Sequence, residues 1–352
     1  EGCKHIFSTF AKKYFLMKLI SYLNSRDEDE LGLLCNDAVY KLTDLDKALP
    51  TNMSDLLFEG SEAIERAQLL NNKIQESPAD YKSKLKLQDL NLLAPVPFPS
   101  SLRDAYAFRQ HVAAGRKNRG LDMIPEFDQF PVFYFSNHNA VSGPGELEFM
   151  SDHFDKLDFE LEVAIVIGKE GRNIKAEEAD EYIAGFMIMN DFSARSLQMQ
   201  EMKLNLGPAK GKDFCTSIGP VLVTPDELHD RLIDPKEGHT GNCYDLEMKA
   251  YVNGKKVSEG NMADMHWTFA EIIERCSYGV ELLPGDVIGS GTVGTGCFLE
   301  LNGTGKRLDE NYKEQWLKAG DTISLEIEGL GRLENIIKAE QSNFSIMKKL
   351  KT

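Results

Sequence analysis

The clearest alternation of apolar and polar residues in the chain covers residues 159–168, where Val and Ile are abundant and a Gly closes the run. This pattern predicts a β-strand. Side chains on a strand alternate between its two faces, so every second residue from Phe159 to Ile167 shares one apolar face. Glu160 and Glu162 lie together on the other face. Two carboxylates therefore stand side by side at the start of a strand that is otherwise suited to burial.

The Glu160–Glu162 pair has two explanations. Like charges at this spacing repel each other, and a buried carboxylate loses its hydration. Either a cation between the two groups or a strand end in water would relieve this cost. Two oxygen ligands suit Mg²⁺, Ca²⁺ or Mn²⁺ better than Zn²⁺. Taken alone, the pair is more typical of a solvated strand end, so a metal site needs support from the rest of the chain.

Strand patterns dominate residues 130–330, with few helices between them. The segments that predict strands are residues 131–134, 185–191, 218–223, 246–252, 255–257, 282–288, 298–301 and 319–327. Asn253-Gly254 is a favoured turn pair for the hairpin between two of them. The segments that predict helices are residues 102–117, 176–184, 192–203 and 269–276. This distribution predicts an α+β, β-rich fold built on a mixed β-roll or barrel-like domain, and it argues against a Rossmann sheet.

Several candidate residues fall at the ends of these predicted elements. Ser100 and Ser101 are the expected cap of helix 102–117, on which Asp104 and His111, seven residues apart, would share one face. Asp191 ends strand 185–191, so it is either a ligand or the N-cap of the next helix. Strand 298–301 carries Glu300, and a buried acid needs a partner, for which a His is the usual candidate.

The N-terminal part has a different pattern. Residues 17–41 predict a hairpin or small meander, and residues 54–75 predict a helix. Three prolines between Leu92 and Ser100 predict an extended domain boundary. We therefore expect a small N-terminal α+β domain over residues 1–92 and a catalytic mixed β-roll domain over residues 93–352. Residues 1–16 are typical of a leader or an expression remnant, with Met17 as a more natural start.

Composition narrows the class of protein. The chain has 352 residues, of which 42% are hydrophobic, and a net charge of −16. A basic footprint for nucleic acid is therefore not expected. Six cysteines are scattered without a Cys-x-x-Cys pair, which argues against zinc-knuckle and thioredoxin motifs and favours a reducing, cytoplasmic setting. No apolar run reaches the length of a membrane span, so no membrane partner is expected.

The glycine-dense loop 289–296 lacks the Gly-Lys-Ser/Thr end of a P-loop and is a poor dinucleotide fingerprint. It is either a tight connection between strands or a place where backbone N–H groups and Thr292 approach a ligand carboxylate. Considered singly, His111 is more typical of a structural side chain than of a catalytic base. Lys212 is likewise more typical of a solvated side chain. A Gly-x-Ser-x-Gly motif is absent, so a hydrolase triad of that kind is unsupported.

Five short segments follow one another in an order that a known family shares. They are Asp104-Ala105-Tyr106 with Arg109-Gln110-His111, Phe159-Glu160-Leu161-Glu162, Asn190-Asp191-Phe192-Ser193-Ala194-Arg195 with Gln198, Gly211-Lys212-Asp213-Phe214, and Pro284-Gly285-Asp286-Val287-Ile288 with Ser290-Gly291-Thr292. Over residues 95–335 the chain resembles the fumarylacetoacetate hydrolase family, closest to its fumarylacetoacetases. The resemblance implies a mixed β-roll, usually as a homodimer, and a divalent metal, Mg²⁺ or Ca²⁺, with Mn²⁺ a further option. The implied metal ligands are Asp104, Glu160, Glu162 and Asp191.

The resemblance also implies chemistry on a diketo acid. His111, paired with Glu300, would activate water, and Lys212 would stabilise negative charge on the leaving carbon fragment. Cleavage between two carbonyls leaves an enolate, whose charge a chelated metal takes up. The side chains implied to hold the substrate are Tyr106, Tyr134, Arg195, Gln198 and Thr292. A basic cluster of Arg116, Lys117 and Arg119 follows the predicted helix; Arg119 is the candidate for substrate contact, but the choice among the three stays open.

Because His111 and Glu300 both match, we expect hydrolysis of fumarylacetoacetate to fumarate and acetoacetate, as in tyrosine breakdown. The alternatives within the family are an acylpyruvate hydrolase, a 2-hydroxyhepta-2,4-diene-1,7-dioate isomerase and an oxaloacetate decarboxylase. A non-catalytic binding protein on the same fold is an alternative from another class. The clustered acids argue against that last option, since stability alone would not favour them.

Overall fold

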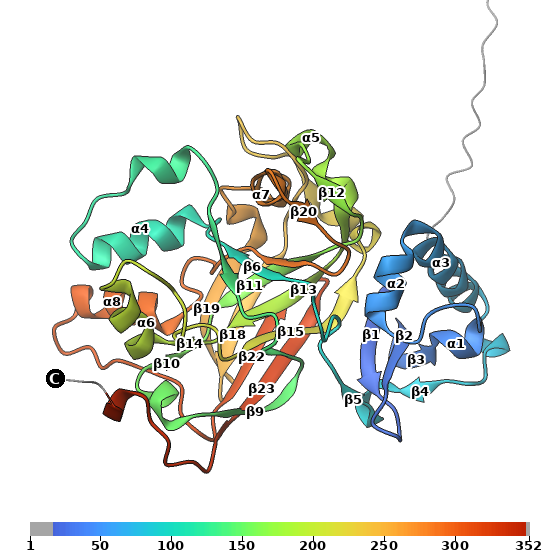
Figure 1. Cartoon of the computed structure of the whole chain (residues 1–352), viewed down its shortest axis with the longest axis horizontal. Helices are drawn as coiled ribbons and strands as arrows, with labels where there is room; N and C mark the ends of the chain where they lie inside the picture. Colours follow the sequence, from blue (N-terminus) through green and yellow to red (C-terminus); the bar gives the residue numbers. More distant parts are fainter. Residues whose placement is uncertain (1–16, 350–352) are drawn as a thin grey trace, which may run out of the picture.

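The computed structural model describes residues 17–349, so the expectation of a leader or remnant at residues 1–16 lies outside the described residues. Its main feature is a twelve-stranded sheet to which both parts of the chain contribute (Figure 1). Along its main path the strands are β4 (Leu85–Lys86), β3 (Ala38–Lys41), β2 (Asp29–Cys35), β1 (Lys18–Leu23), β15 (Thr216–Val223), β13 (Ile183–Asp191), β11 (Leu161–Ile167), β21 (Val287–Gly289), β6 (Leu102–Ala105) and β7 (Phe133–Ser136). Off this path, β5 (Asn91–Leu92) pairs with β1 and β8 (Val141–Ser142) pairs with β15.

A second sheet of five strands completes the roll. Its order is β19 (Lys255–Asn261), β18 (Glu247–Val252), β22 (Thr322–Ile327), β23 (Gly331–Ala339) and β9 (Gly145–Phe149). Three short ladders pair β10 (Leu157–Asp158) with β14 (Ser193–Ala194), β12 (Gly171–Arg172) with β20 (Glu281–Leu282), and β16 (Leu232–Ile233) with β17 (Cys243–Tyr244). The α-helices are α1 (Leu42–Leu45), α2 (Met53–Glu59), α3 (Ser61–Glu76), α4 (Arg109–Asn118), α5 (Ala176–Ala179), α6 (Arg195–Met202), α7 (Phe269–Ser277) and α8 (Phe298–Leu308). The predicted α+β, β-rich roll is therefore confirmed.

Strand β11 lies between two hydrophobic cores. All seven of its residues are buried. Val163 packs in a core that includes Leu325 of the five-stranded sheet, whereas Ala164 packs in a second core with Leu56 of α2. Each fully buried large aliphatic side chain contributes roughly 1.5–3 kcal/mol to folding. Because it is packed on both faces, β11 is a rigid support for the carboxylates at its start.

Two local predictions are confirmed. Residues 17–41 form the antiparallel meander of β1, β2 and β3. The hairpin of β18 and β19 turns at Asn253 and Gly254, whose φ angles are +51° and +75°.

 Both residues lie in the left-handed region that a tight hairpin turn requires, and Asn and Gly tolerate it better than other residues.

The predicted helix over residues 102–117 is wrong in its first half. Residues 102–105 form β6, which pairs in parallel with β21 and antiparallel with β7, and α4 begins only at Arg109. Ser100 and Ser101 therefore cap no helix, and the Ser101 hydroxyl donates to Asp286 Oδ1 at 2.6 Å. Asp104 and His111 consequently lie on a strand and a helix, not on one helical face. Pairing with distant strands outweighs the local helical pattern here.

The predicted strand over residues 298–301 is also wrong, because these residues begin helix α8. The Phe298 and Leu299 N–H groups donate to the carboxylate of Asp158, at 2.8 and 2.9 Å. This distant acceptor satisfies donors that a helix start leaves free. Asp191 is not an N-cap, since α6 begins at Arg195.

The remaining differences concern boundaries. Residues 54–75 contain two helices, α2 and α3, separated at Gly60, where φ is +77°. Helix 176–184 is shorter than expected, because α5 ends at Ala179 and β13 begins at Ile183. β1 of the N-terminal part pairs with β15, so the large sheet continues across the expected domain boundary between residues 92 and 93. The division into two domains at that boundary stays a prediction. Among residues 17–349, no helix combines the length and apolarity needed to cross a bilayer.

Candidate active site

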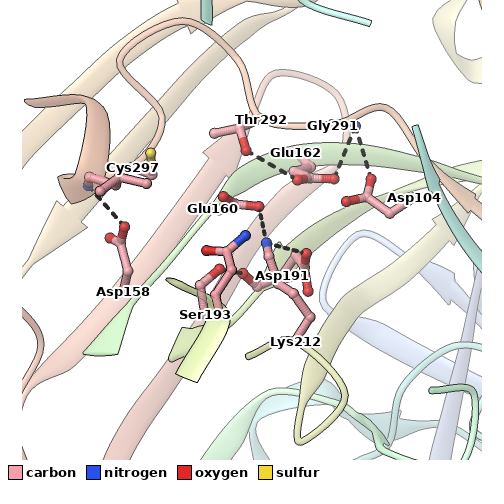
Figure 2. Close-up of polar contacts among 12 residues, drawn as sticks. Asp104, Asp158, Glu160, Glu162, Asp191, Ser193, Lys212, Gly291, Thr292 and Cys297 are labelled. Atoms are coloured by element: carbon pink, nitrogen blue, oxygen red, sulfur yellow. Dashed lines mark hydrogen bonds and ion pairs between the residues drawn. The ribbon is translucent and has the colours of Figure 1, made fainter. Parts of the chain in front are cut away.

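Four carboxylates from separate segments meet at one end of the large sheet. Asp104 lies on β6, Glu162 on β11 and Asp191 at the end of β13, and Glu160 directly precedes β11. One carboxylate oxygen from each residue lies within 4.8 Å of the others, and all four residues are buried. Gly289 of β21 makes this approach possible, because a Cβ there would stand 2.7 Å from Asp104 Oδ1. The structure thus brings the four predicted metal ligands together (Figure 2).

The four carboxyl groups differ in their preference for the charged form. Burial and the nearby Asp191 raise the pKa of Asp104 to about 8. Burial and the charges of Asp104 and Glu160 raise the pKa of Glu162 well above its ordinary value, and burial raises the pKa of Asp191. Glu160 is the exception: burial raises its pKa, but Lys212 and Arg195 outweigh burial and lower it. The cluster therefore resists carrying four negative charges at once.

Two buried cations compensate part of this charge. Lys212 Nζ donates to the carboxylates of Glu160 and Asp191. Arg195 Nη2 donates to Glu160 Oε1 at 2.7 Å, and its Nη1 donates to Gln198 Oε1 at 3.1 Å. Asp191 and Glu160 raise the pKa of Lys212 although burial opposes them, so the ammonium stays charged. Lys212 is thus buried at the centre of the site, not solvated.

The donor set fits a hard divalent cation. It consists of carboxylate oxygens, which Mg²⁺, Ca²⁺ and Mn²⁺ prefer. Asp191 Oδ1 is buried without a hydrogen-bond partner, which leaves it free to be a ligand. The Gly291 N–H is shared between Asp104 Oδ1 and Glu162 Oε2, at 3.1 Å from each. A cation among these oxygens would remove the repulsion that raises three of the pKa values.

An imidazole–carboxylate pair lies beside the four carboxylates. His111 Nδ1 and Glu300 Oε2 are 2.6 Å apart. His111 comes from α4 and Glu300 from the first turn of α8, and these helices lie next to each other (Figure 1). A ring nitrogen of His111, a Glu160 oxygen and Cys297 Sγ lie within 4.8 Å of one another. The pair predicted from the sequence is therefore formed, and it adjoins the acidic cluster.

The remaining predicted residues line the same region or its edge. Tyr134 donates its hydroxyl to Asp191, and Thr292 donates to Glu162 Oε1 at 3.4 Å. The Tyr106 ring contacts the His111 ring edge to face, with centroids 5.9 Å apart. Arg119 is exposed at the end of α4. Its positive charge acts on Tyr106: burial and Glu160 raise the pKa of the Tyr106 hydroxyl, and Arg119 lowers it.

The other two members of the basic cluster lie further from this chemistry. Arg116 Nε donates to the carbonyl of Asp122, and Lys117 is exposed. Of the three, Arg119 is the one whose charge acts on Tyr106.

Sequence reasoning missed two buried residues of the site. Asp158 accepts Arg195 Nε at 2.8 Å, and Cys297 lies beside His111 and Glu160. Asp158 carries a weak signal, since it is an acid only two residues before Glu160 in an apolar segment. Cys297 follows the glycine-dense loop and gives no sequence signal of its own.

The sequence model of the fumarylacetoacetate (FAA) hydrolase C-terminal domain matches residues 101–338. The chain belongs to the fumarylacetoacetate hydrolase family. This family member is 29% identical to the oxaloacetate tautomerase YisK of Bacillus subtilis over 322 residues, which cover 87% of the chain and 95% of the relative. It is 27% identical over 325 residues to a mitochondrial oxaloacetate tautomerase of Xenopus laevis, covering 91% of the chain and 89% of that protein.

Solved structures of the family share the fold. Fumarylacetoacetate hydrolase from the psychrophilic Exiguobacterium antarcticum matches with a TM-score of 0.67 at 25% identity, covering 92% of this chain and 100% of that one. Maleylpyruvate hydrolase from Sphingobium sp. SYK-6, solved in complex with manganese (II) ion and pyruvate, matches with a TM-score of 0.64 at 21% identity, covering 92% and 100%. At 21% identity, the likeness to maleylpyruvate hydrolase concerns the fold alone.

These comparisons correct one expectation. The family is confirmed, but the two curated relatives named above are tautomerases. They favour the alternative family reactions over fumarylacetoacetate hydrolysis in tyrosine breakdown. The physical reason is that a His–Glu pair beside a metal site can serve proton transfer at carbon as well as activation of water, so the pair does not select one reaction.

Proposed function

We propose that this chain is a metal-dependent enzyme that catalyses keto–enol tautomerisation of a small 2-oxo dicarboxylic acid such as oxaloacetate. The observation that carries the proposal is the 2.6 Å contact between His111 Nδ1 and Glu300 Oε2, directly beside four clustered carboxylates. Two relatives, matched over most of their length, are oxaloacetate tautomerases, which supports this choice of reaction.

His111 is the proton carrier in this proposal. Glu300 accepts the hydrogen bond from His111 Nδ1, which leaves Nε2 as the basic nitrogen. Nε2 takes the proton from the carbon next to the keto group and gives it to the enolate oxygen, and the reverse sequence converts the enol to the keto form. Glu300 fixes the ring and stabilises the imidazolium between the two transfers. Held by Asp104, Glu160, Glu162 and Asp191, a divalent cation would polarise the keto oxygen and lower the energy of the enolate.

Cationic side chains would bind and orient the two carboxylates of the substrate. Arg195 contacts Glu160, and Gln198 accepts a hydrogen bond from Arg195, so these two side chains can hold the carboxylate next to the keto group. Arg119, exposed near Tyr106, can hold the far carboxylate. Lys212 keeps a positive charge next to the developing enolate and also balances Glu160 and Asp191.

Hydrolysis of a diketo acid is the second candidate. The same His111–Glu300 pair can activate a water molecule, and the Exiguobacterium structure matched at 25% identity is a fumarylacetoacetate hydrolase. The maleylpyruvate hydrolase solved in complex with manganese (II) ion and pyruvate matches at only 21% identity, so it adds to this candidate only that the fold is shared. The two candidates differ in whether a C–C bond is broken.

One substrate panel separates the candidates. The protein is treated with chelator, reloaded with Mg²⁺, Mn²⁺ or Ca²⁺, and mixed with enol-oxaloacetate, an acylpyruvate and fumarylacetoacetate while ultraviolet absorbance is followed. We expect metal-dependent loss of the enol form of oxaloacetate. His111→Gln should lower this rate by a factor of about 10²–10⁴, whereas the exposed His229→Gln should not change it. Turnover of the diketo acids without any effect on enol-oxaloacetate would refute the tautomerase assignment and support the hydrolase.

A further inference from the structure

Asp158 makes four hydrogen bonds although it is completely buried. Its Oδ1 accepts the backbone N–H of Phe159 at 3.0 Å and of Phe298 at 2.8 Å. Its Oδ2 accepts the N–H of Leu299 at 2.9 Å and Arg195 Nε at 2.8 Å. These donors come from Phe159, which directly follows β10, from the start of α8 and from α6. One carboxylate thus joins three separate segments of the site.

The first link is to the helix that carries Glu300. Phe298 and Leu299 are the first two residues of α8, and Glu300 is the third. The N–H groups of a first helical turn have no partners within the helix. The N-cap residue Cys297 offers only a sulfur acceptor, 3.5 Å from the Glu300 N–H. Asp158 therefore supplies the strong capping interaction, and the position of Glu300 opposite His111 depends on it.

The second link is to the residues around the four clustered carboxylates. Arg195 is buried and divides its guanidinium between Asp158, Glu160 and Gln198. A guanidinium is planar and its donors have fixed directions. Its bond to Asp158 therefore sets the direction in which Arg195 meets Glu160. Through Arg195 on one side and α8 on the other, Asp158 connects the predicted metal ligand to the predicted base.

We propose that Asp158 is a positioning residue that fixes the His111–Glu300 pair relative to Glu160 and Arg195. This inference deepens the proposed function and rests on it for the kinetic test. The side chain touches no reacting atom. Its action is to hold two separate parts, the first turn of α8 and the guanidinium of Arg195, in one arrangement. A displacement of about 1 Å in such parts is enough to reduce turnover strongly.

The test compares Asp158→Asn with Asp152→Asn. Asparagine keeps the size of the side chain but loses its charge and one acceptor. Asp152 is a matched control, because it also accepts backbone N–H groups, of Ile346 and Met347 at 2.7 and 3.1 Å, and lies outside the machinery described above. We expect Asp158→Asn to lower kcat about ten- to a hundredfold with KM changed less than about twofold. Asp152→Asn should leave both unchanged.

A spectroscopic reading tests the same idea without turnover. The proton between His111 and Glu300 should give a downfield imidazole resonance in the NMR spectrum, assigned by its loss in Glu300→Gln. We expect Asp158→Asn to shift or remove it and to weaken Mn²⁺ binding about tenfold, while Asp152→Asn preserves both. An unchanged resonance, or an equal fall of kcat in the two variants, would overturn the proposal.

The two failures can be told apart. If the wild-type protein acts on no 2-oxo acid, the proposed function fails, yet the resonance and the Mn²⁺ titration still decide the role of Asp158. If Asp158→Asn does not fold, Asp158→Ser replaces it with the same measurements, because a serine oxygen can still accept one N–H of α8 while the bond to Arg195 is lost.

Discussion

Replacing Asp104 with Asn should make the metal-free protein more stable. Burial and the nearby Asp191 raise the pKa of Asp104 from 3.8 to about 8. At pH 7 the folded protein therefore retains a proton that the unfolded chain has released. The gap between 3.8 and pH 7 is about 3 pH units at about 1.4 kcal/mol each, so this retention costs at most about 4 kcal/mol. Asn carries no such cost and keeps an oxygen for the Gly291 N–H.

The assay is urea unfolding of both proteins in EDTA and in excess Mn²⁺. In EDTA at pH 7 we expect Asp104→Asn to be more stable by about 1–4 kcal/mol. Because the folded pKa is raised, the stability that Asp104 contributes is present below pH 3.8 and is lost as pH rises towards 8. The advantage of the variant should therefore grow between pH 5 and pH 8. In Mn²⁺ the order should reverse, since metal at a thousand times its Kd adds about 4 kcal/mol to the wild type.

The control variant, Asp152→Asn, should change the stability of the protein in the opposite direction to Asp104→Asn. Hydrogen bonds from Ser345 and from the backbone of Met347 lower the pKa of Asp152, although burial opposes them. The stability that the Asp152 carboxylate contributes is present at neutral pH and is lost as pH falls. Asp152→Asn should therefore be less stable than the wild type at pH 7, both in EDTA and in Mn²⁺. A less stable Asp104→Asn in EDTA, or an advantage that does not grow with pH, would contradict the reasoning.

Two other substitutions test the charges around the site. Lys212→Met removes the cation between Glu160 and Asp191, so it should lower the free energy of unfolding by about 3 kcal/mol. Turnover should fall as well, while calorimetry should still detect Mn²⁺ binding. Loss of Mn²⁺ binding would count against the assignment of Lys212 as a residue that balances charge and stabilises the enolate. Burial and Lys210 lower the pKa of His153 to about 4, so stability should fall as pH drops from about 6.5 towards 4. His153→Gln should flatten the decrease in Tm between pH 7 and pH 5, and an equal decrease would refute this.

The sequence is informative where the structure is local. The alternation in β11 predicts which residues face each core, since Val163 and Ala164 indeed pack in different ones. The turn at Asn253 is set by the two residues that form it. The Glu160–Glu162 pair draws attention to its segment, because two carboxylates stand on a strand that is otherwise suited to burial, but the pair alone does not predict a metal site.

The sequence is misleading where partners come from a distance. Residues 102–105 form a strand because β21 and β7 lie on either side of them, and these strands come from other parts of the chain. Residues 298–301 begin a helix because Asp158, 140 residues earlier, accepts the N–H of Phe298. Neither partner is visible in a local pattern. Asp104 and Glu300 are nevertheless among the residues predicted for the site, because the family resemblance does not depend on the element that carries them.

The four carboxylates of the site are not equivalent, and this difference has a chemical consequence. Lys212 and Arg195 keep Glu160 ionised, whereas burial and mutual repulsion raise the pKa values of Asp104, Glu162 and Asp191. A divalent cation would therefore meet one ready ligand and would have to displace protons from others. Metal affinity should accordingly rise with pH up to about 8, the pKa of Asp104. The two buried cations thus do not merely offset the acidic cluster, because by holding Glu160 ionised they provide the first oxygen to which a metal can bind.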